Sequence, residues 1–293
     1  MWGKVLVALF LALALGVGLV AALGIEVVGR QAIAEDPRSG EVATFEEVAS
    51  AHDALFGAHV HDDGVDWAAL SADPAALRAL GALYARSGPV SGSLGATGPD
   101  AALAFRIDAY DALVALGVVE HTVARGAPLA SIDDVHGVLD PGGGFGFYTA
   151  QVFVLDGSLT NLGDLRRTIL SRGDPRVLGL LHDGTRSSPL PPRRAIREAD
   201  LDDALAEAGT RLTEPPCVSL DAEAREIVLA HFYGSERVRF EGHARSLGEL
   251  PTVVAWIAHH AHPSVRDAVL RAEADGFAVR VLPEDRALAT HAP

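Results

Sequence analysis

The chain opens with one continuous apolar run and then changes to shorter, periodic patterns. From Val5 to Ile25 (VLVALFLALALGVGLVAALGI) no side chain is charged. At about 1.5 Å per helical residue, this run is long enough to cross the roughly 30 Å hydrocarbon core of a bilayer. We therefore predict an N-terminal membrane anchor in residues 1–30, followed by a linker over residues 31–43.

The charges beside the run predict its orientation. Lys4 precedes it, and Glu35 and Asp36 follow it. The positive-inside rule then places the N-terminus in the cytoplasm and the rest of the chain on the periplasmic or extracellular side. The alternative is a secretory signal peptide cleaved near Ala34, where small residues occur. The run exceeds the roughly 7–15 residues of a usual signal core, which favours an uncleaved anchor, and either interpretation exports the domain.

Helical spacing of apolar residues continues along most of the remaining chain. Thr44, followed by Glu46 and Glu47, predicts a capped helix that ends near Gly57. Asp73 and Pro74 predict a second helix start. The longest pattern predicts a central, largely buried helix over residues 99–125. Further helices are predicted over residues 160–171, 199–212, 247–261 and 264–274.

Strand patterns are fewer and shorter. The strongest covers residues 147–155 (FYTAQVFVL) and ends at the turn dipeptide Asp156-Gly157. Other strands are predicted at 177–181, 227–229, 238–240 and 277–282, with loops at 87–99, 140–144 and 187–192. Helices outnumber strands and do not alternate regularly with them. We therefore predict an α+β fold, a mostly helical single domain over residues 44–293 with a small, largely antiparallel sheet.

Composition narrows the range of partners. The formal net charge is −15 and the pI is near 5.1, which argues against nucleic acid as a partner, because phosphate backbones attract basic surfaces. Acidity also opposes contact with anionic lipid, so attachment to a membrane is expected through the anchor alone. Cys217 is the one cysteine, which excludes an internal disulfide and favours a small buried residue over a reactive thiol.

Three segments resemble, in order, the family catalogued as domain of unknown function 547. They are FGAHVHDDGVDWAAL from Phe56, FRIDAYDAL from Phe105, and residues 162–170 followed by DPRVLGLLHDGTRSSP from Asp174. The second resembles the family's Phe-Trp-Ile-Asn-Ala-Tyr-Asn-Ala-Leu motif, and the third resembles its strand, helix and Ser-Cys-Pro block. The resemblance covers about residues 45–240 and invites comparison with papain-like or transglutaminase-like cysteine hydrolases.

This chain departs from that family at the polar positions. Where the family has Trp, two Asn, a Glu-His pair, a His and two Cys, this chain has Arg106, Asp108, Asp111, Arg166, Arg167, Leu178, Asp183 and Ser188, respectively. If the family works as a cysteine hydrolase, the resemblance implies that this member has lost the catalytic groups.

Ser188 and His182 form one candidate catalytic pair. A serine hydroxyl acts as a nucleophile only with a base within about 2.6–3.2 Å. Pro189 restricts Ser188 to extended geometry, unlike the strand-to-helix elbow of many serine hydrolases. A structural role for Ser188 in a loop turn is therefore favoured over a catalytic role.

The predicted central helix carries a second polar candidate. Asp108 and Asp111 lie on neighbouring positions of one helix face, with Arg106 and Tyr110 beside them. The two carboxylates have the chemistry for general acid and base work. A salt-bridge network with Arg106, or with Arg166 and Arg167, is favoured, and these six residues are also the best candidates for a polar binding pocket.

Two histidine clusters remain, at residues 59–61 and 259–262. Neither has the HExxH spacing of a zinc helix. Solvated positions near helix ends are favoured over metal ligation, so we predict no metal and no other cofactor. The leading hypothesis is a membrane-anchored, outward-facing module that binds an unknown protein or small-molecule ligand without catalysis. The alternative is an exported hydrolase that uses Ser188 and His182, or the Asp108 and Asp111 face.

Overall fold

The computed structural model describes residues 42–92, 98–135 and 146–291. The predicted anchor from Val5 to Ile25, the small residues near Ala34 and the loop at 140–144 lie outside these ranges. Within them, no helix combines the length and the apolar character needed to span a bilayer.

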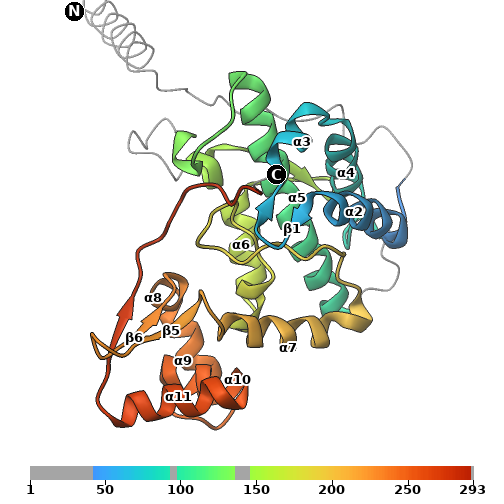
Figure 1. Ribbon diagram of the computed structural model, residues 1–293. Coiled ribbons are helices and arrows are strands. Elements are labelled where there is room, and N and C mark those ends of the chain that lie inside the picture. The colour runs from blue at the N-terminus through green and yellow to red at the C-terminus, as the bar shows by residue number, and fades with distance from the viewer. Residues whose placement is uncertain (1–41, 93–97, 136–145, 292–293) are drawn as a thin grey trace, which may run out of the picture.

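Helices make up most of the described chain, and the strands are short (Figure 1). The α-helices are α2 (Phe45–His59), α3 (Trp67–Ala72), α4 (Ala75–Arg86), α5 (Pro99–Arg125), α6 (Leu162–Leu170), α7 (Leu201–Leu212), α8 (Phe232–Ser235), α9 (Arg237–Ser246), α10 (Val253–His260) and α11 (Pro263–Ala274). The strands are β1 (Val60–His61), β2 (Gly64–Val65), β3 (Phe153–Leu155), β4 (Ser158–Thr160), β5 (Val218–Asp221), β6 (Glu226–Leu229) and β7 (Ala278–Val281). The predicted α+β class, mostly helical, is confirmed.

Helix α5 is the central element, as its uninterrupted apolar pattern predicts. It is buried along most of its length and contacts α3, α4 and α6. Its C-terminal end is capped by Gly126 in the left-handed conformation (φ 63°). Any segment that packs against α5 therefore has to supply hydrogen-bond partners for the buried polar side chains on it.

The predicted N-terminal signals also hold for α2. The Thr44 hydroxyl accepts a hydrogen bond from the Glu47 N–H (3.3 Å), and the Glu47 carboxylate accepts one from the Thr44 N–H (2.7 Å). This reciprocal pair satisfies two amide groups that the first helical turn leaves without partners. The helix continues to His59, slightly beyond the predicted end at Gly57.

The strands form three separate small sheets instead of the one predicted sheet. β1 pairs with β2, β3 with β4 and β5 with β6, all antiparallel, while β7 lies parallel to β6. The β3–β4 turn is Asp156-Gly157, with φ of 49° and 74°. Both positions are left-handed, as a tight hairpin turn of this type requires, so this dipeptide is a correct local prediction.

Two strand predictions are wrong and a third holds only in part, because tertiary packing overrides local preference. In residues 147–155 only β3 is extended, and the segment Gly146–Ala150 (η2) is a π-helix in which Phe147 is fully buried. The predicted strand at 177–181 is instead the 3-10 helix η3 (Pro175–Gly179), which begins after Asp174 and Pro175. Residues 238–240 lie inside α9, where the Phe240 ring packs 4.7 Å from the ring of Trp256.

The structure has two parts joined by a returning segment (Figure 1). We call residues 42–213 the main body and residues 214–282 the C-terminal lobe, which holds α8–α11 and β5–β7. Residues 283–291 form a strap that leaves the lobe and runs back over the main body. Buried apolar residues of both parts form one continuous cluster.

The strap is held by backbone and side-chain hydrogen bonds to distant parts of the main body. The Ala289 carbonyl accepts from the Val65 N–H (2.9 Å) and from the Trp67 indole N–H (3.1 Å). At Gly64 a Cβ atom would lie 2.5 Å from the backbone of Thr290 and of His291. Glycine is therefore required at this position for the strap to approach the hairpin.

Candidate functional site

The structure brings Ser188 and His182 together, as the sequence suggests. The Ser188 Oγ lies 3.1 Å from His182 Nδ1. It also lies 2.9 Å from the Thr185 carbonyl oxygen and accepts from the Asp183 N–H at 3.1 Å. The carbonyl can only accept, so the hydroxyl proton of Ser188 points to Thr185. The serine closes a tight turn through two backbone contacts.

The tautomer of His182 follows from a second carbonyl. Its Nδ1 lies 2.9 Å from the Pro189 carbonyl oxygen. Because that oxygen has no proton to give, Nδ1 must carry the proton. The imidazole nitrogen that faces Ser188 is therefore a donor and not a base. Burial lowers the pKa of His182 to about 4, so the ring is neutral near pH 7.

Asp108 and Asp111 are placed differently from the salt-bridge prediction. Both side chains are about 2 % exposed. Asp108 accepts from the Ile196 N–H (2.9 Å to Oδ2), and Asp111 accepts from the His182 N–H (2.8 Å to Oδ1). Their hydrogen-bond partners are thus backbone amides of a segment that crosses α5, and Arg106, Arg166 and Arg167 pair with neither. The predicted network is wrong.

Burial raises the pKa of both carboxyl groups well above the usual range for aspartate. Two carboxyls with almost no exposure cannot reach a substrate in solvent. The Asp108 and Asp111 face is therefore a structural part of the core in the described chain.

Tyr110, Arg166 and Arg167 lie together near a second set of charges. The Tyr110 hydroxyl donates to Asp183, and Arg166 lies between Asp183 (3.8 Å) and Glu236 (2.9 Å). Burial alone would lower the pKa of Arg166, but Asp183, Tyr110 and Glu236 raise it above the ordinary value. Arg166 is thus a fixed cation inside a pair of carboxylates.

These groups border a hollow of about 520 Å³, which we call the charged pocket. Its lining includes Tyr148, Arg166, Arg167, Glu236, Glu284 and Arg286. Arg167 is 74 % exposed and pairs with Asp164 at 2.5 Å on its own helix. Three of the six predicted binding residues therefore meet here, at or directly behind this surface, while Asp108 and Asp111 lie elsewhere in the core.

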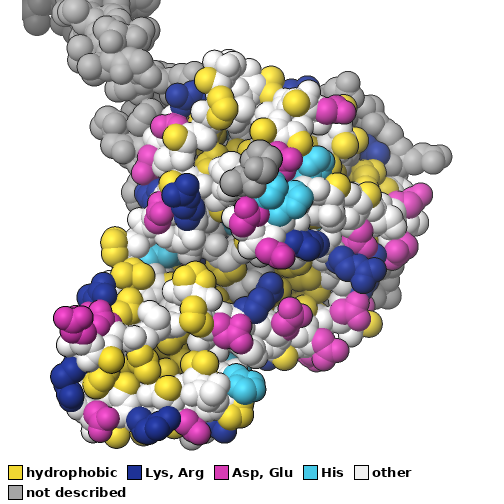
Figure 2. Space-filling view, viewed as in Figure 1, with side chains coloured by type: hydrophobic (Ala, Val, Ile, Leu, Met, Phe, Trp, Pro, Cys, Tyr) yellow, Lys and Arg dark blue, Asp and Glu magenta, His cyan; other side chains and the backbone are white. Residues whose placement is uncertain are grey.

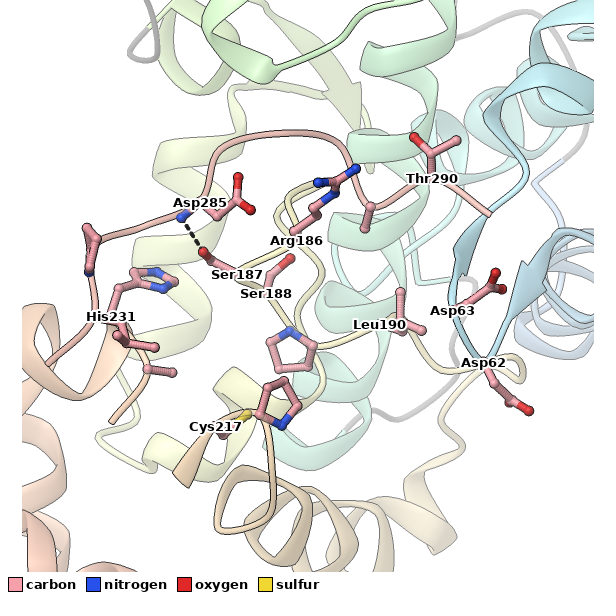
Figure 3. A pocket seen from close by; sticks show the side chains of 16 residues that line it. Asp62, Asp63, Arg186, Ser187, Ser188, Leu190, Cys217, His231, Asp285 and Thr290 are labelled. Carbon is pink, nitrogen blue, oxygen red and sulfur yellow. Dashed lines mark hydrogen bonds between the residues drawn. The ribbon is translucent and has the colours of Figure 1, made fainter. Parts of the chain in front are cut away.

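A second opening lies where the main body meets the lobe. We call it the junction groove, a hollow of about 480 Å³ lined by residues that include Ser188, Leu190, Cys217, His231, Leu282 and Asp285 (Figure 3). Figure 2 shows hydrophobic side chains at the junction between the main body and the C-terminal lobe, with charged side chains around them. The groove continues into a hollow of about 790 Å³ that shares Leu190 and Cys217 with it and follows the chain from Pro189 to Ile196.

The strap separates the groove from the charged pocket. Pro283 and Asp285 line the groove, whereas Glu284 and Arg286 line the charged pocket. This alternation is the one expected for an extended chain, whose successive side chains point to opposite sides. The Asp285 N–H donates to the Ser187 hydroxyl, which joins the strap to the serine turn (Figure 3).

His231, Glu236 and Asp285 were not predicted as site residues. They come from the lobe and the strap, at least 40 positions along the chain from the serine turn. No local motif marks them, because only the tertiary fold brings them to this junction. Cys217 also lines the groove, and burial raises the pKa of its thiol to about 11, which agrees with an unreactive role.

Histidines of both clusters pack against neighbouring aromatic or imidazole rings. The His61 ring stacks on that of His291 at 3.9 Å, and His291 Nδ1 lies 2.6 Å from Asp63. His260 is packed against Trp256 (4.4 Å between ring centroids), and burial with neighbouring His259 lowers its pKa to about 4. His260 is therefore not the solvated helix end that was predicted. In the described ranges, no group of three or more such side chains is arranged to hold a metal ion.

Comparisons with protein-family models, curated protein sequences and solved structures found no match to this chain. The resemblance to domain of unknown function 547 stays a prediction.

Proposed function

We propose that the chain is a membrane-anchored, outward-facing binding module, a degenerate relative of the domain of unknown function 547 family. The uncharged run from Val5 to Ile25 supports the proposed anchor, and the position of Lys4 before this run supports the proposed outward orientation. The loss of catalysis rests on the serine turn, and the binding role on the junction groove beside it.

The main support for the proposal is that the hydroxyl proton of Ser188 and the Nδ1 proton of His182 are both hydrogen-bonded to backbone carbonyl groups. The Ser188 proton goes to the Thr185 carbonyl and the His182 Nδ1 proton to the Pro189 carbonyl. General-base catalysis by His182 would need Nδ1 without a proton. That tautomer would set its lone pair against a carbonyl oxygen only 2.9 Å away. The arrangement thus favours a turn that shapes one wall of the groove.

The shape and lining of the groove favour an extended peptide segment as the ligand. Leu190, Pro216 and Leu282 provide apolar surface, and the groove continues along the extended segment after Pro189. Among the described lining residues, Asp62, Asp63 and Asp285 oppose one guanidinium, Arg186. An apolar segment with basic residues complements this lining, and the overall charge of −15 points the same way.

Binding can be tested on the full-length protein in mild detergent with two fluorescent decapeptides. One alternates Leu and Pro with Arg, and its counterpart has Glu in place of each Arg. The basic peptide is expected to bind at least about tenfold more tightly by fluorescence polarisation, because electrostatic complementarity of about 1.4 kcal/mol gives this ratio.

Leu190→Gln should weaken that binding at least about fivefold, since it places an amide on the apolar wall of the groove. The matched control is Leu250→Gln, because Leu250 is 73 % exposed in the α9–α10 loop. Equal affinity for both peptides, or an equal effect of the two leucine variants, would rule out the groove as the site.

The second candidate function is an exported hydrolase, and the 3.1 Å contact between Ser188 and His182 is the observation that favours it. An activated serine reacts with a fluorophosphonate probe, whereas a serine whose proton is held by a carbonyl does not. We expect no labelling of the full-length protein. Labelling that maps to Ser188 and disappears in Ser188→Ala would replace the binding proposal with the hydrolase.

A further inference from the structure

A much smaller cavity lies beside the continuation of the junction groove, with which it shares Val60 and Pro191. Apolar side chains from α2, the β1–β2 hairpin, α3 and α5 form most of its wall, among them Leu55, Phe56 and Trp67. Three polar residues complete it, His59, Asp111 and His182, and the last two have buried polar atoms without a hydrogen-bond partner among the described residues. Its volume, about 10 Å³, is close to the minimum that admits one water molecule.

Asp111 has one oxygen without a protein partner. Its Oδ1 accepts from the His182 N–H at 2.8 Å. Its Oδ2 is buried and has no hydrogen-bond partner among the described residues. Because burial raises the pKa of this carboxyl well above its ordinary value and so favours the protonated form, we expect Oδ2 to be a donor that lacks an acceptor.

His182 has a buried acceptor without a donor. With the proton on Nδ1 and directed to the Pro189 carbonyl, Nε2 has a free lone pair and can only accept. Nε2 is also buried and has no partner among the described residues. A buried donor and a buried acceptor therefore belong to side chains that line the same cavity, and leaving both unmet would be costly.

We propose that one ordered water molecule occupies this cavity and bridges Asp111 Oδ2 to His182 Nε2. Asp111 donates to the water, and the water donates to Nε2. His182 then donates from Nδ1 to Pro189, and Ser188 donates to Thr185. Each group in this chain of hydrogen bonds donates one proton to the next acceptor. Because the water donates to Nε2, that nitrogen stays unprotonated, and the proton of His182 stays on Nδ1, the nitrogen that faces Ser188. The water site does not depend on what the junction groove binds.

The direct test is a high-resolution crystal structure of the full chain together with the ¹⁵N shifts of His182 in solution. We expect density for one water within hydrogen-bond distance of both atoms. Nε2 is expected to resonate as an unprotonated nitrogen that accepts a hydrogen bond, and Nδ1 as a protonated one. An Nε2 that carries the proton, or a direct contact between Asp111 and His182 without water, would overturn the proposal.

Two isosteric variants give an independent measurement. Asp111→Asn keeps an oxygen for the His182 N–H and offers an N–H to the water, so its melting temperature at pH 7 should equal or exceed that of the parent. Asp111→Leu removes both groups and should melt lower by at least about 4 °C. Equal losses in the two variants would contradict the donor role of Asp111, and the ¹⁵N measurement on the parent remains decisive if either variant fails to fold.

Discussion

Asp53 and Asp108 accept hydrogen bonds from neighbouring peptide groups of one segment, yet the structure treats the two carboxyl groups in opposite ways. Asp53 on α2 accepts from the Ala195 N–H at 2.5 Å, and Asp108 on α5 accepts from the Ile196 N–H at 2.9 Å. The pKa of Asp53 is lowered, whereas the pKa of Asp108 is raised well above its ordinary value. A backbone amide is thus not sufficient to keep a carboxylate charged.

The difference comes from burial and from the reach of one arginine. Burial raises the pKa at both positions, but Asp53 is only partly buried, and hydrogen bonds from Arg197 (2.9 Å) and Ala195 more than offset it. Asp108 is wholly buried and has only the amide in contact, with Arg197 acting from a distance. Of these two aspartates, the one that Arg197 contacts directly is therefore the one whose pKa is lowered.

The largest expected effect is on Asp108. Its folded-state pKa lies above the unfolded value, so the unfolded chain loses a proton that the folded chain keeps as pH rises above about 4. Stability then falls with pH, by up to about 1.4 kcal/mol per unit. Asp108→Asn removes this penalty and should stabilise the protein at pH 7, with little change at pH 3.5. Urea unfolding of the full-length protein at both pH values measures it.

Asp108→Leu is the matched variant, since it removes the acceptor for the Ile196 N–H and should lose about 1–3 kcal/mol relative to Asp108→Asn at both pH values. If Asp108→Asn were less stable than the parent at pH 7, the carboxyl would have to be ionised in the fold, and the comparison with Asp53 would fail.

A smaller effect of the opposite sign is expected at Asp53. Its lowered pKa means that its stabilising contribution is present above the unfolded value and is lost as pH falls through the folded value. Asp53→Asn should cost about 1 kcal/mol at pH 7, since side chains 24–28 % exposed are partly screened, and progressively less as the pH falls below about 4. Raising the salt to 1 M should shrink the cost at Asp53 by a few tenths of a kcal/mol and leave the Asp108 variants unchanged. A salt effect at Asp108 would point to an unseen charged partner there.

The sequence is sufficient where one element determines the outcome. Thr44 and Glu47 cap α2 through contacts three positions apart, and the apolar pattern from Pro99 to Arg125 is long enough to predict α5 without reference to its neighbours. The Ser188 and His182 pair is also predictable, because six positions separate them in one turn.

The sequence alone does not predict a side chain's surroundings where its hydrogen-bond partner is a backbone group far away along the chain. The amide that binds Asp108 comes from 88 positions away and the one that binds Asp111 from 71. Periodicity can place these carboxyls on one face of a helix, but it cannot reveal that uncharged amides meet them instead of arginines. The segment from Phe147 has strong strand preference and still forms a π-helix, because burying Phe147 contributes more than local propensity.

The strap has a consequence for how the chain is made. Trp67 and its partner carbonyl at Ala289 are separated by 222 positions. During synthesis from the N-terminus, the β1–β2 hairpin and the Trp67 indole N–H emerge long before the segment that pairs with them. The growing chain therefore carries an open strand edge, a natural contact for a chaperone, until residues 283–291 arrive to cover it.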